Sequence, residues 1–583
     1  MRTPLLLIVV ALSALIIVGW WSMAGRNVPD ADFVFVSAAP HKTLDPQQMS
    51  WLDEIRIAEC LYEPLVKFNV PSLDMVGGVA ERWEVEPTEQ GERYTFDLRA
   101  DAKWSNGDAV TAHDFVYAWR RAMMPDFAAQ YFNLMWVIEG AREFYDWRQE
   151  QLLNYESQNN KTPEAARQLW QEAVERFAST VGIKAADDHT LVVHLERPTP
   201  YFLELCAFAT FMPVHRETVE KFVEGPDQTT GRMRQQAWVS PGRVVCNGPY
   251  VLSERKIKEY LLMNANPHHW NRAAMGNGSI LERIIENTQT ALLAYDQGEV
   301  HWLPDIPTAK SLAADLIAAN RTDVHVFPAA GTYYYLFNCH PKLPDGSTNP
   351  LADSRVRRAL SMTIDRKRIV ESVTRMNQPV AHTFTPVGAV PAYEPPAVAG
   401  ARFDPDRARR LMLEAGFADH SMLKGLSILY NTGQGHEQIA QFIQQSWRTH
   451  LDVHVELEGI EKKVFGDRRR KHHFTISRGG WFGDYRDPTT FLDLFRTGGG
   501  QNDGQYSNPQ FDRLLDQAVF ERDPKRRMAI LREAETLVLN DQAVAPLFQY
   551  VEMQIFDTAR VEGLAPNAWH HRRLELVRVV SKQ

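Results

Sequence analysis

Cysteine is scarce in this chain of 583 residues, which has only four. They lie at Cys60, Cys206, Cys246 and Cys339, too few and too scattered for a disulfide scaffold. No two of them form the C-x-x-C pair that is typical of zinc and redox sites. We expect buried free thiols, and one bridge stays open as an alternative if the protein is exported.

The chain also lacks an excess of basic residues. It has 64 Lys and Arg against 73 Asp and Glu, a formal net charge of −9, and no basic block long enough to follow a phosphate backbone. Nucleic acid is therefore not an expected partner. With 44% hydrophobic and 23% charged residues, the composition indicates a large globular protein of three or four units.

The usual signatures of catalysis are missing. The sequence contains no G-x-S-x-G, H-E-x-x-H or G-x-x-x-x-G-K-[ST] motif and no spaced cluster of Cys and His. Three His–His pairs occur, at 268–269, 472–473 and 570–571, but adjacent side chains on a strand or helix point apart, so one pair rarely supplies two ligands to one ion. We expect neither an enzyme nor a metal or other cofactor.

There is one long hydrophobic run, from Thr3 to Gly25 behind Arg2. It is long enough for a membrane span, and it also resembles a signal peptide cleaved after the small residues 22–24. No cysteine follows it, which excludes a lipid-anchored lipoprotein. The basic residue before the run predicts that the amino terminus stays inside and the body lies outside. Residues 1–26 are thus a signal or an anchor, and the length favours an anchor.

Strand and helix patterns alternate along the body. Apolar residues recur at the strand period in Tyr94–Leu98 and Leu191–Leu195. Helices are predicted after Asp404, Asn508 and Asp523, each followed by proline. A further amphipathic helix is predicted over 162–177. No fixed repeat is present, so the body is expected to be α/β or α+β.

Several motifs together resemble the extracytoplasmic solute-binding proteins, family 5, of ATP-binding-cassette importers, and especially their oligopeptide binders. In chain order the motifs are Val79–Val85, Tyr94–Arg99, Asp101–Met123, Asn247–Tyr250, Asn266–Asn271, Thr332–Tyr335, Asp353–Leu360, Ile364–Arg366, Arg478–Tyr485 and Asp487–Leu492. Their order is also that of the family, and they span nearly the whole chain beyond residue 30.

The resemblance implies a periplasmic-binding-protein-like type II clamp, with two main lobes joined by a hinge and an additional domain. Domain I then comprises 30–72, 209–330 and 550–583, domain II comprises 73–208 with a helical insertion near 147–178, and domain III comprises 331–549. The implied function is a monomeric, non-catalytic receptor in the periplasm, held at the inner membrane by its amino-terminal segment. It would capture oligopeptides and present them to the permease subunits of the importer.

The resemblance also implies a set of ligand-binding residues. Asp484 would pair with the ammonium of a peptide, because an enclosed charge needs a partner. Trp481 would form an apolar wall, and Gly480 would let an extended peptide approach the backbone. The carboxylate end would be held by cations or donors, for which Arg is well suited. These implied residues are Arg478, Arg469 and His436. Tyr131 and Tyr550 would lie against the ligand.

Each of these residues has an ordinary structural alternative. Asp484 is also typical of a turn before Asp487–Pro488. Arg469 belongs to the run 468–471, which is also typical of a solvated surface. His436 follows a glycine-bearing turn into a helix, where a surface histidine is common, and the tryptophan and both tyrosines also suit a core.

Departures from the family concern the ligand pockets. This chain has Lys462 where enteric oligopeptide binders have a tryptophan, and Arg375 near the hinge. The positions of the enteric disulfide appear here as Gly331 and Phe482, so that bridge is missing. We expect a different length and side-chain preference of the ligand. Two other functions stay open: a receptor of the same fold for another solute, and a membrane-anchored signalling or scaffolding protein of the envelope.

Overall fold

A computed structural model describes residues 28–580, except for 160, 307–310, 344–345, 418–422, 424 and 434. The predicted signal or anchor at 1–26 lies outside these residues. Among the helices that the structure describes, none is long and apolar enough to cross a membrane.

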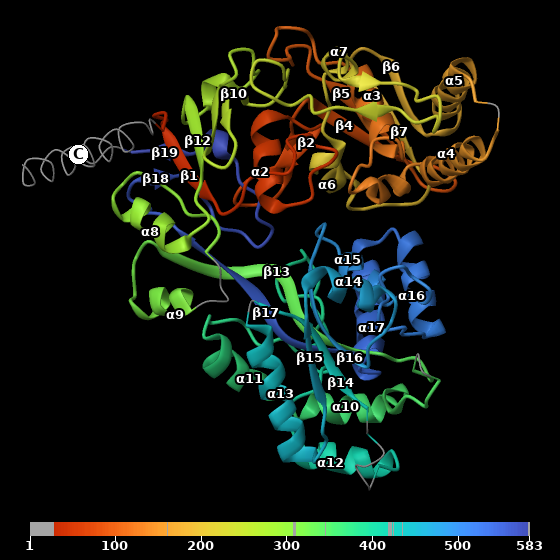
Figure 1. Cartoon of the computed structure of the whole chain (residues 1–583), viewed down its shortest axis with the longest axis vertical. Coiled ribbons are helices and arrows are strands. Elements are labelled where there is room, and N and C mark those ends of the chain that lie inside the picture. The colour runs from red at the N-terminus through yellow and green to blue at the C-terminus, as the bar shows by residue number, and fades with distance from the viewer. Residues whose placement is uncertain are drawn as a thin grey trace, which may run out of the picture.

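The chain folds into two lobes (Figure 1). In one lobe a four-stranded sheet has the order β1-β12-β11-β10, with β1 and β12 parallel and the other pairs antiparallel. Its strands are β1 Phe33–Ser37, β10 Tyr250–Lys256, β11 Tyr260–Ala265 and β12 Ser279–Ile284. Helices α2 Leu52–Leu61 and α8 Thr288–Asp296 belong to this part of the lobe. The carboxyl-terminal strands β18 Val561–Glu562 and β19 Arg578–Val579 return to it, where Asn277 donates to the backbone of Leu574 and Val577.

A second, antiparallel sheet of the same lobe has the order β4-β5-β7-β6. Its strands are β4 Ala80–Pro87, β5 Glu92–Leu98, β6 Ile183–Asp187 and β7 Thr190–Leu195. Burial alternates along β5 and β7, which confirms the two strands predicted from the sequence. The helices around this sheet are α3 Ala112–Met123, α4 Ala141–Glu156, α5 Pro163–Thr180, α6 Phe202–Cys206 and α7 Arg216–Glu220. Helix α5 confirms the helix predicted over 162–177, and Thr162 caps it by accepting from the Ala165 amide.

The other lobe is built on a five-stranded sheet of order β15-β14-β16-β13-β17. Its strands are β13 Val324–Phe337, β14 Ser427–Asn431, β15 Glu456–Ile460, β16 Ile476–Phe482 and β17 Val544–Ile555. Its helices are α10 Ser354–Met362, α11 Arg366–Arg368, α12 Pro405–Glu414, α13 His436–Leu451, α14 Lys462–Arg470, α15 Thr489–Leu492, α16 Pro509–Phe520 and α17 Pro524–Asn540. The three Pro-started helices were predicted, and Asp404, Asn508 and Asp523 cap them through their side chains.

Two long strands connect the lobes. Strands β13 and β17 pair antiparallel from Val324↔Ile555 to Leu336↔Val544, with irregularities between Pro328 and Thr332 and again at Tyr333 and Tyr334. At their far end Leu303 bridges Ile555, while Trp302 bridges Phe35 of β1. Figure 1 shows this ribbon and helix α9 Ser311–Ala318 in the region between the lobes.

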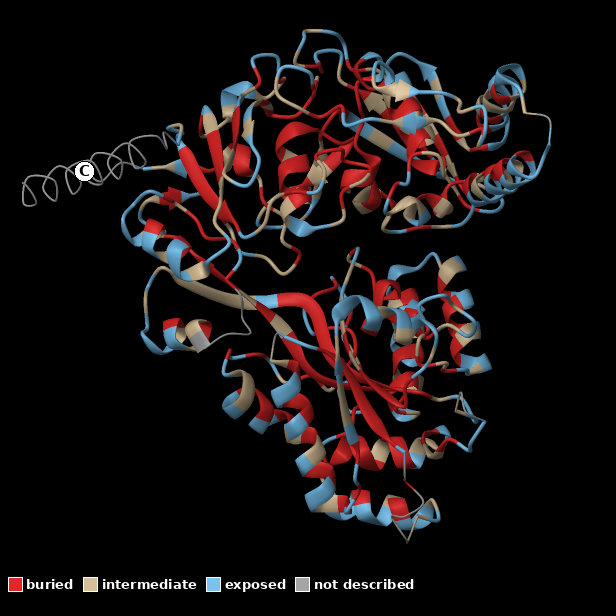
Figure 2. Ribbon diagram, viewed as in Figure 1, coloured by how far each residue is buried: buried red, intermediate tan, exposed pale blue. Residues whose placement is uncertain are grey.

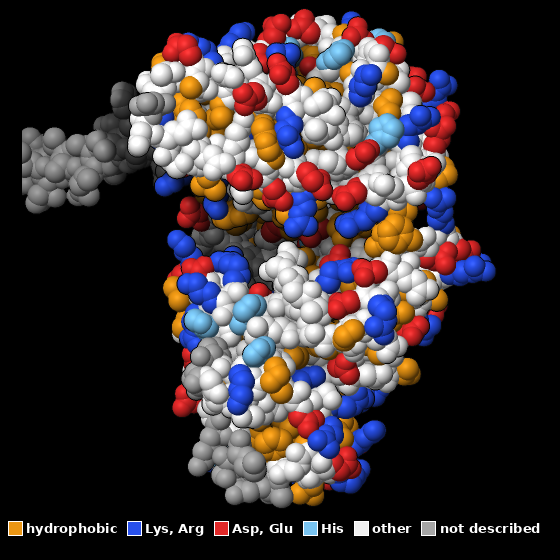
Figure 3. Space-filling view, turned by 90° about the vertical axis from the view of Figure 1, so that its right-hand side faces the viewer, with side chains coloured by type: hydrophobic (Ala, Val, Ile, Leu, Met, Phe, Trp, Pro, Cys, Tyr) orange, Lys and Arg blue, Asp and Glu red, His pale blue; other side chains and the backbone are white. Residues whose placement is uncertain are grey.

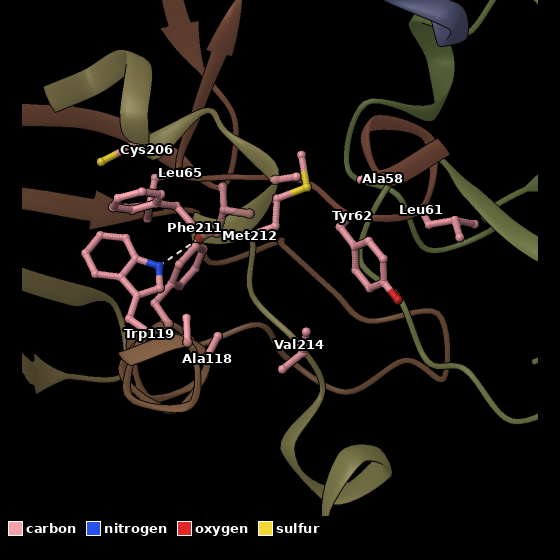
Figure 4. Packing of buried hydrophobic residues seen from close by; sticks show 14 of the residues in the cluster. Ala58, Leu61, Tyr62, Leu65, Ala118, Trp119, Cys206, Phe211, Met212 and Val214 are labelled. Carbon is pink, nitrogen blue, oxygen red and sulfur yellow. Dashed lines mark hydrogen bonds between the residues drawn. The ribbon is translucent and has the colours of Figure 1, made fainter. Parts of the chain in front are cut away.

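Each lobe has its own hydrophobic core (Figure 2). In the first lobe, residues from distant segments meet around Trp119, whose indole N–H donates to the Phe211 carbonyl at 2.7 Å (Figure 4). All four cysteines are free, and only Cys339 is not fully buried, which confirms the expected thiols. The mixed α/β class predicted from the sequence is also confirmed.

Candidate ligand-binding cleft

A cleft with a volume of about 800 Å³ lies between the lobes. Figure 3 shows the hollow that separates them. Its walls come from the sheet strands β13, β16 and β17, the first turn of α13, the segments 304–306 and 373–378, and His570 of the carboxyl-terminal segment. Its size falls within the usual range for small-molecule sites.

One face of the five-stranded sheet forms a wall of the cleft. Successive side chains of a strand point to opposite faces, so Arg478, Gly480 and Phe482 of β16 share this face. In the neighbouring strands, Tyr333 of β13 and Tyr550 of β17 line the same cleft. The register places Tyr333 opposite Gly480. The sheet thus brings Arg478, Gly480 and Tyr550, three of the residues that the resemblance implied, to one wall of the cleft.

Arg478 carries a positive charge that no carboxylate of the described residues neutralises by an ion pair. Its guanidinium donates to Asn431 Oδ1 and to the Tyr550 hydroxyl, each at 3.3 Å, and lies 5.2 Å from the centre of the Tyr333 ring. Its Nε is buried without a hydrogen-bond partner, and among the described residues no carboxylate forms an ion pair with it. An unpaired guanidinium in a cleft is suited to a ligand carboxylate.

His436, the first residue of α13, also lines the cleft and is only 3% exposed. Burial and the charge of Arg478 lower the pKa of its ring to about 3, so the imidazole is neutral. Its Nδ1 lies 3.2 Å from the Tyr333 hydroxyl, and its Nε2 has no partner in the described structure. A neutral ring that accepts from Tyr333 at Nδ1 carries its proton on Nε2, which can donate to a ligand oxygen.

Gly480 was expected to let a peptide approach the backbone. The structure places the Tyr550 hydroxyl in the space beside it, and a Cβ at position 480 would overlap that oxygen. Tyr550 in turn stacks on Phe482, with ring centres 4.6 Å apart and planes inclined by 21°. The glycine therefore makes room for Tyr550, which brings the tyrosine hydroxyl to Arg478.

Asp484 lies just beyond β16, and its side chain is exposed. Its backbone N–H donates to Thr490 Oγ1 at 2.9 Å. Although water reaches the carboxylate, the surrounding protein partly desolvates it, which raises its pKa to about 6. No described cation pairs with it. Burial and the charge of Asp484 together raise the pKa of Tyr131, so the charge of Asp484 on one lobe acts on Tyr131 of the other.

Four predicted site residues do not line the cleft: Asp484 and Tyr131, described above, and Trp481 and Arg469. Trp481 is half-buried on the opposite face of β16, where its indole donates to the Thr490 carbonyl at 2.8 Å and packs against the core of its own lobe. Arg469 on α14 forms an ion pair with Asp503 at 2.7 Å. Neither residue lines the cleft described above.

Sequence reasoning missed a polar group at the hinge end of the cleft. It comprises Asp305, Glu552 and His570, and Arg375 lies on the same lining. Glu552 contacts His570 through Oε1 and Nδ1. Burial and the charge of Asp305 raise the pKa of Glu552 to about 8, while burial and nearby arginines lower that of His570 to about 3, so both groups favour their uncharged forms.

The signal for these residues in the sequence is weak. Arg375 stands out only as a departure from the family, and the others meet because β17 and the carboxyl-terminal segment return to the hinge. No group of three or more His, Cys, Asp or Glu arranged for a metal ion occurs in the described part of the chain.

Comparison with known proteins identifies the family. A family model described as "Bacterial extracellular solute-binding proteins, family 5 Middle" matches residues 74–503. The periplasmic murein peptide-binding protein MppA of Escherichia coli (strain K12) is 32% identical over 517 residues, covering 87% of this chain and 86% of the relative. The oligopeptide-binding protein OppA of Bacillus subtilis (strain 168) is 31% identical over 506 residues, covering 85% of this chain and 83% of the relative.

Solved structures agree with this. The unliganded open form of MppA superposes with a TM-score of 0.75 at 28% identity, covering 95% of this chain and 98% of that one. The type II clamp predicted from the sequence is thereby confirmed. The chain belongs to the bacterial extracellular solute-binding proteins of family 5.

Proposed function

We propose that this protein is an extracytoplasmic receptor that binds oligopeptides between its lobes and delivers them to an ATP-binding-cassette importer. One observation carries the proposal: the described structure leaves two opposite charges without charged partners, Arg478 in the cleft between the lobes and Asp484 just beyond the end of the same strand. The Nε of Arg478 is buried without a partner, which is costly, and the exposed Asp484 carboxylate is open to a cation. A ligand that carries both opposite charges therefore gains from this arrangement. A free peptide is such a ligand.

The relatives support the same choice of ligand. Their names describe a murein peptide binder and an oligopeptide binder, and the chain matches each over more than four fifths of its length. The likeness to an unliganded open form supports a receptor that closes about its hinge, since a ligand that contacts both lobes favours the closed state. The receptor acts as a monomer and catalyses no reaction.

The individual site residues belong to this proposal. Asp484 and Tyr131 hold the ammonium end of the peptide from opposite lobes. Arg478 and His436 hold its carboxylate, and Tyr550 keeps the guanidinium in place. Arg469 and Trp481 support the site from behind the wall.

Trialanine with free or blocked ends tests this assignment by calorimetry. Acetylation of the amino end or amidation of the carboxyl end should each weaken binding at least about tenfold, since each removes a pair worth ~1.4 kcal/mol or more. Asp484→Asn should abolish the discrimination against the acetylated peptide only. Arg478→Gln should abolish the discrimination against the amide only.

Equal affinity of the three peptides for the wild-type protein would refute the assignment. Peptides found by mass spectrometry in the purified protein would support import. An empty cleft together with a stable partner protein would instead favour the scaffolding function.

The hydrophobic run within residues 1–26 and the periplasmic relatives both support a receptor outside the cytoplasm. We propose that residues 1–26 are retained as an anchor in the inner membrane, which their length supports. Sequencing the amino terminus of the mature protein from membranes checks this, and a mature chain that begins near Gly25 would contradict the anchor.

A further inference from the structure

Side chains next to Asp484 connect the two lobes. This contact is separate from the hinge strands β13 and β17. The contact is made by the interlobe loop, residues 483–487, which projects from the lobe that carries β16. Its counterpart is α6 with the preceding Tyr201, on the side of the first lobe that faces the second (Figure 1). We call the four residues Tyr201, Glu204, Tyr485 and Arg486 the latch.

The aromatic half of the latch is a stacked pair. Tyr201 and Tyr485 have ring centres 3.8 Å apart and planes inclined by 8°. Tyr485 is only 9% exposed and packs in the hydrophobic core of the first lobe. Among the described residues between 303 and 555, no other residue belongs to this core. One lobe therefore inserts a side chain into the core of the other.

The charged half is an ion pair between the same two elements. Arg486 donates to the Glu204 carboxylate twice, through its backbone N–H at 2.7 Å and through Nε at 2.9 Å. The two side chains are 12% and 14% exposed. The guanidinium also lies 5.1 Å from the centre of the Phe68 ring. Such a shielded, two-point contact is much stronger than an exposed ion pair.

The base of the loop is fixed to its own lobe. Asp487 forms a buried ion pair with both terminal nitrogens of Arg527 on α17, and it accepts from the Thr489 amide at 3.0 Å. The loop is thus held at both sides, by α17 at its base and by α6 at its tip. Asp484 lies on this held segment, next to Tyr485.

We propose that the latch sets the separation of the lobes and thereby positions Asp484 for its ligand. This inference rests on the peptide-binding function proposed above, but the latch also acts on the peptide-free protein. When Arg486 and Glu204 separate, the lobes move apart and Asp484 moves away from Tyr131. Both residues are positioning residues that need not contact the peptide.

The full-length protein with Glu204→Gln, Arg486→Gln or both tests the latch. Small-angle scattering without peptide should show a larger radius of gyration for each variant than for the wild type. Calorimetry with trialanine should show about tenfold weaker binding. The double variant should bind trialanine no more weakly than the single variant with the lower affinity, because the two residues act as one pair.

Glu220→Gln is the matched control, since Glu220 pairs with Arg216 within α7 in an exposed setting. It should change neither the radius of gyration nor the affinity. Tyr201→Leu is a second probe, which removes the stack and keeps the ion pair, and it should also expand the peptide-free protein.

The outcomes separate the two proposals. If the wild type binds no peptide, the proposed function fails. The radius of gyration of the peptide-free variants, compared with the wild type, still tests the latch. If the wild type binds trialanine while both Gln variants and Tyr201→Leu keep its radius of gyration and affinity, the latch is wrong and the peptide site stands.

Discussion

Asp484 has a pKa of about 6, so its charge changes within two pH units of neutrality. The other groups assigned to the ligand keep their charge state between pH 5 and 7: His436 has a pKa of about 3, and a peptide ammonium, with a pKa of about 7.7–8.0, is mostly protonated at pH 7. The carboxylate is the form that binds an ammonium. Protonation of Asp484 therefore competes directly with the ligand.

We expect the affinity for trialanine to fall about tenfold between pH 7 and pH 5, because about one tenth of Asp484 is ionised one unit below its pKa. Calorimetry at several pH values measures this. Asp484→Asn should bind weakly at all these pH values, and a pH profile unchanged by this substitution would assign the effect to another group.

The same shift predicts the effect on stability. The folded pKa lies above the usual value, so folding favours the protonated form, and stability is lost as pH rises through this window. Asp484→Asn should therefore raise the melting temperature at pH 7 while it weakens binding. A lower melting temperature of the variant at pH 7, relative to the wild type, would contradict this sign.

Gly480 offers a second prediction at this scale. In Gly480→Ala the added methyl group overlaps the Tyr550 hydroxyl, which forces the ring from its place. Overpacking of this kind costs about 1–3 kcal/mol of unfolding free energy. Urea denaturation measures the loss, and Tyr550→Phe in the same chain should recover part of it because the overlapping oxygen is gone. Equal stability of Gly480→Ala and the wild type would contradict the contact.

At the scale of elements, the helices are stabilised by local capping. Asp523 accepts from the Arg526 amide at 2.8 Å at the start of α17. Asp523→Ala should lower the unfolding free energy by about 1 kcal/mol, whereas Asp523→Ser should keep most of it. Denaturant titration compares the two, and equal losses in both variants would show that the cap is not the cause.

Local signals also explain which elements the sequence predicts. Some features depend only on residues that are neighbours in the sequence, so they can be predicted from it. These are the caps at Asp404, Asn508 and Asp523 and the alternating burial along β5 and β7. The order β15-β14-β16-β13-β17 depends on pairings between distant segments, and composition does not encode it. The resemblance to a family supplied what local patterns lacked.

The site divides in the same way. Arg478 and Tyr550 were named from the resemblance to the family, and the sheet brings them to one wall. Trp481 lies on the other face of β16 because successive side chains of a strand alternate in direction, and Tyr550 fills the space above Gly480. Local sequence does not state either neighbour. Glu552 and His570 escaped notice because they meet only through the hinge.

At the scale of the whole molecule, the two lobes need no covalent cross-link. Three of the four thiols are buried and none forms a bridge. We expect four thiols per chain to react with a chromogenic disulfide reagent in denaturant, and reductant to leave the melting temperature unchanged. Fewer than four reactive thiols would indicate a bridge in the exported protein.

The ribbon of β13 and β17 has a mechanical consequence. Its backbone hydrogen bonds connect the two strands to each other, so a twist or bend of the ribbon turns one half of the protein against the other without breaking the ladder. The rotation of one lobe against the other is then an elastic deformation of the ribbon, and each lobe moves as a rigid body because its core is tightly packed. The free-energy barrier to ligand release therefore comes mainly from the contacts between the lobes, and the hinge ribbon contributes little to it.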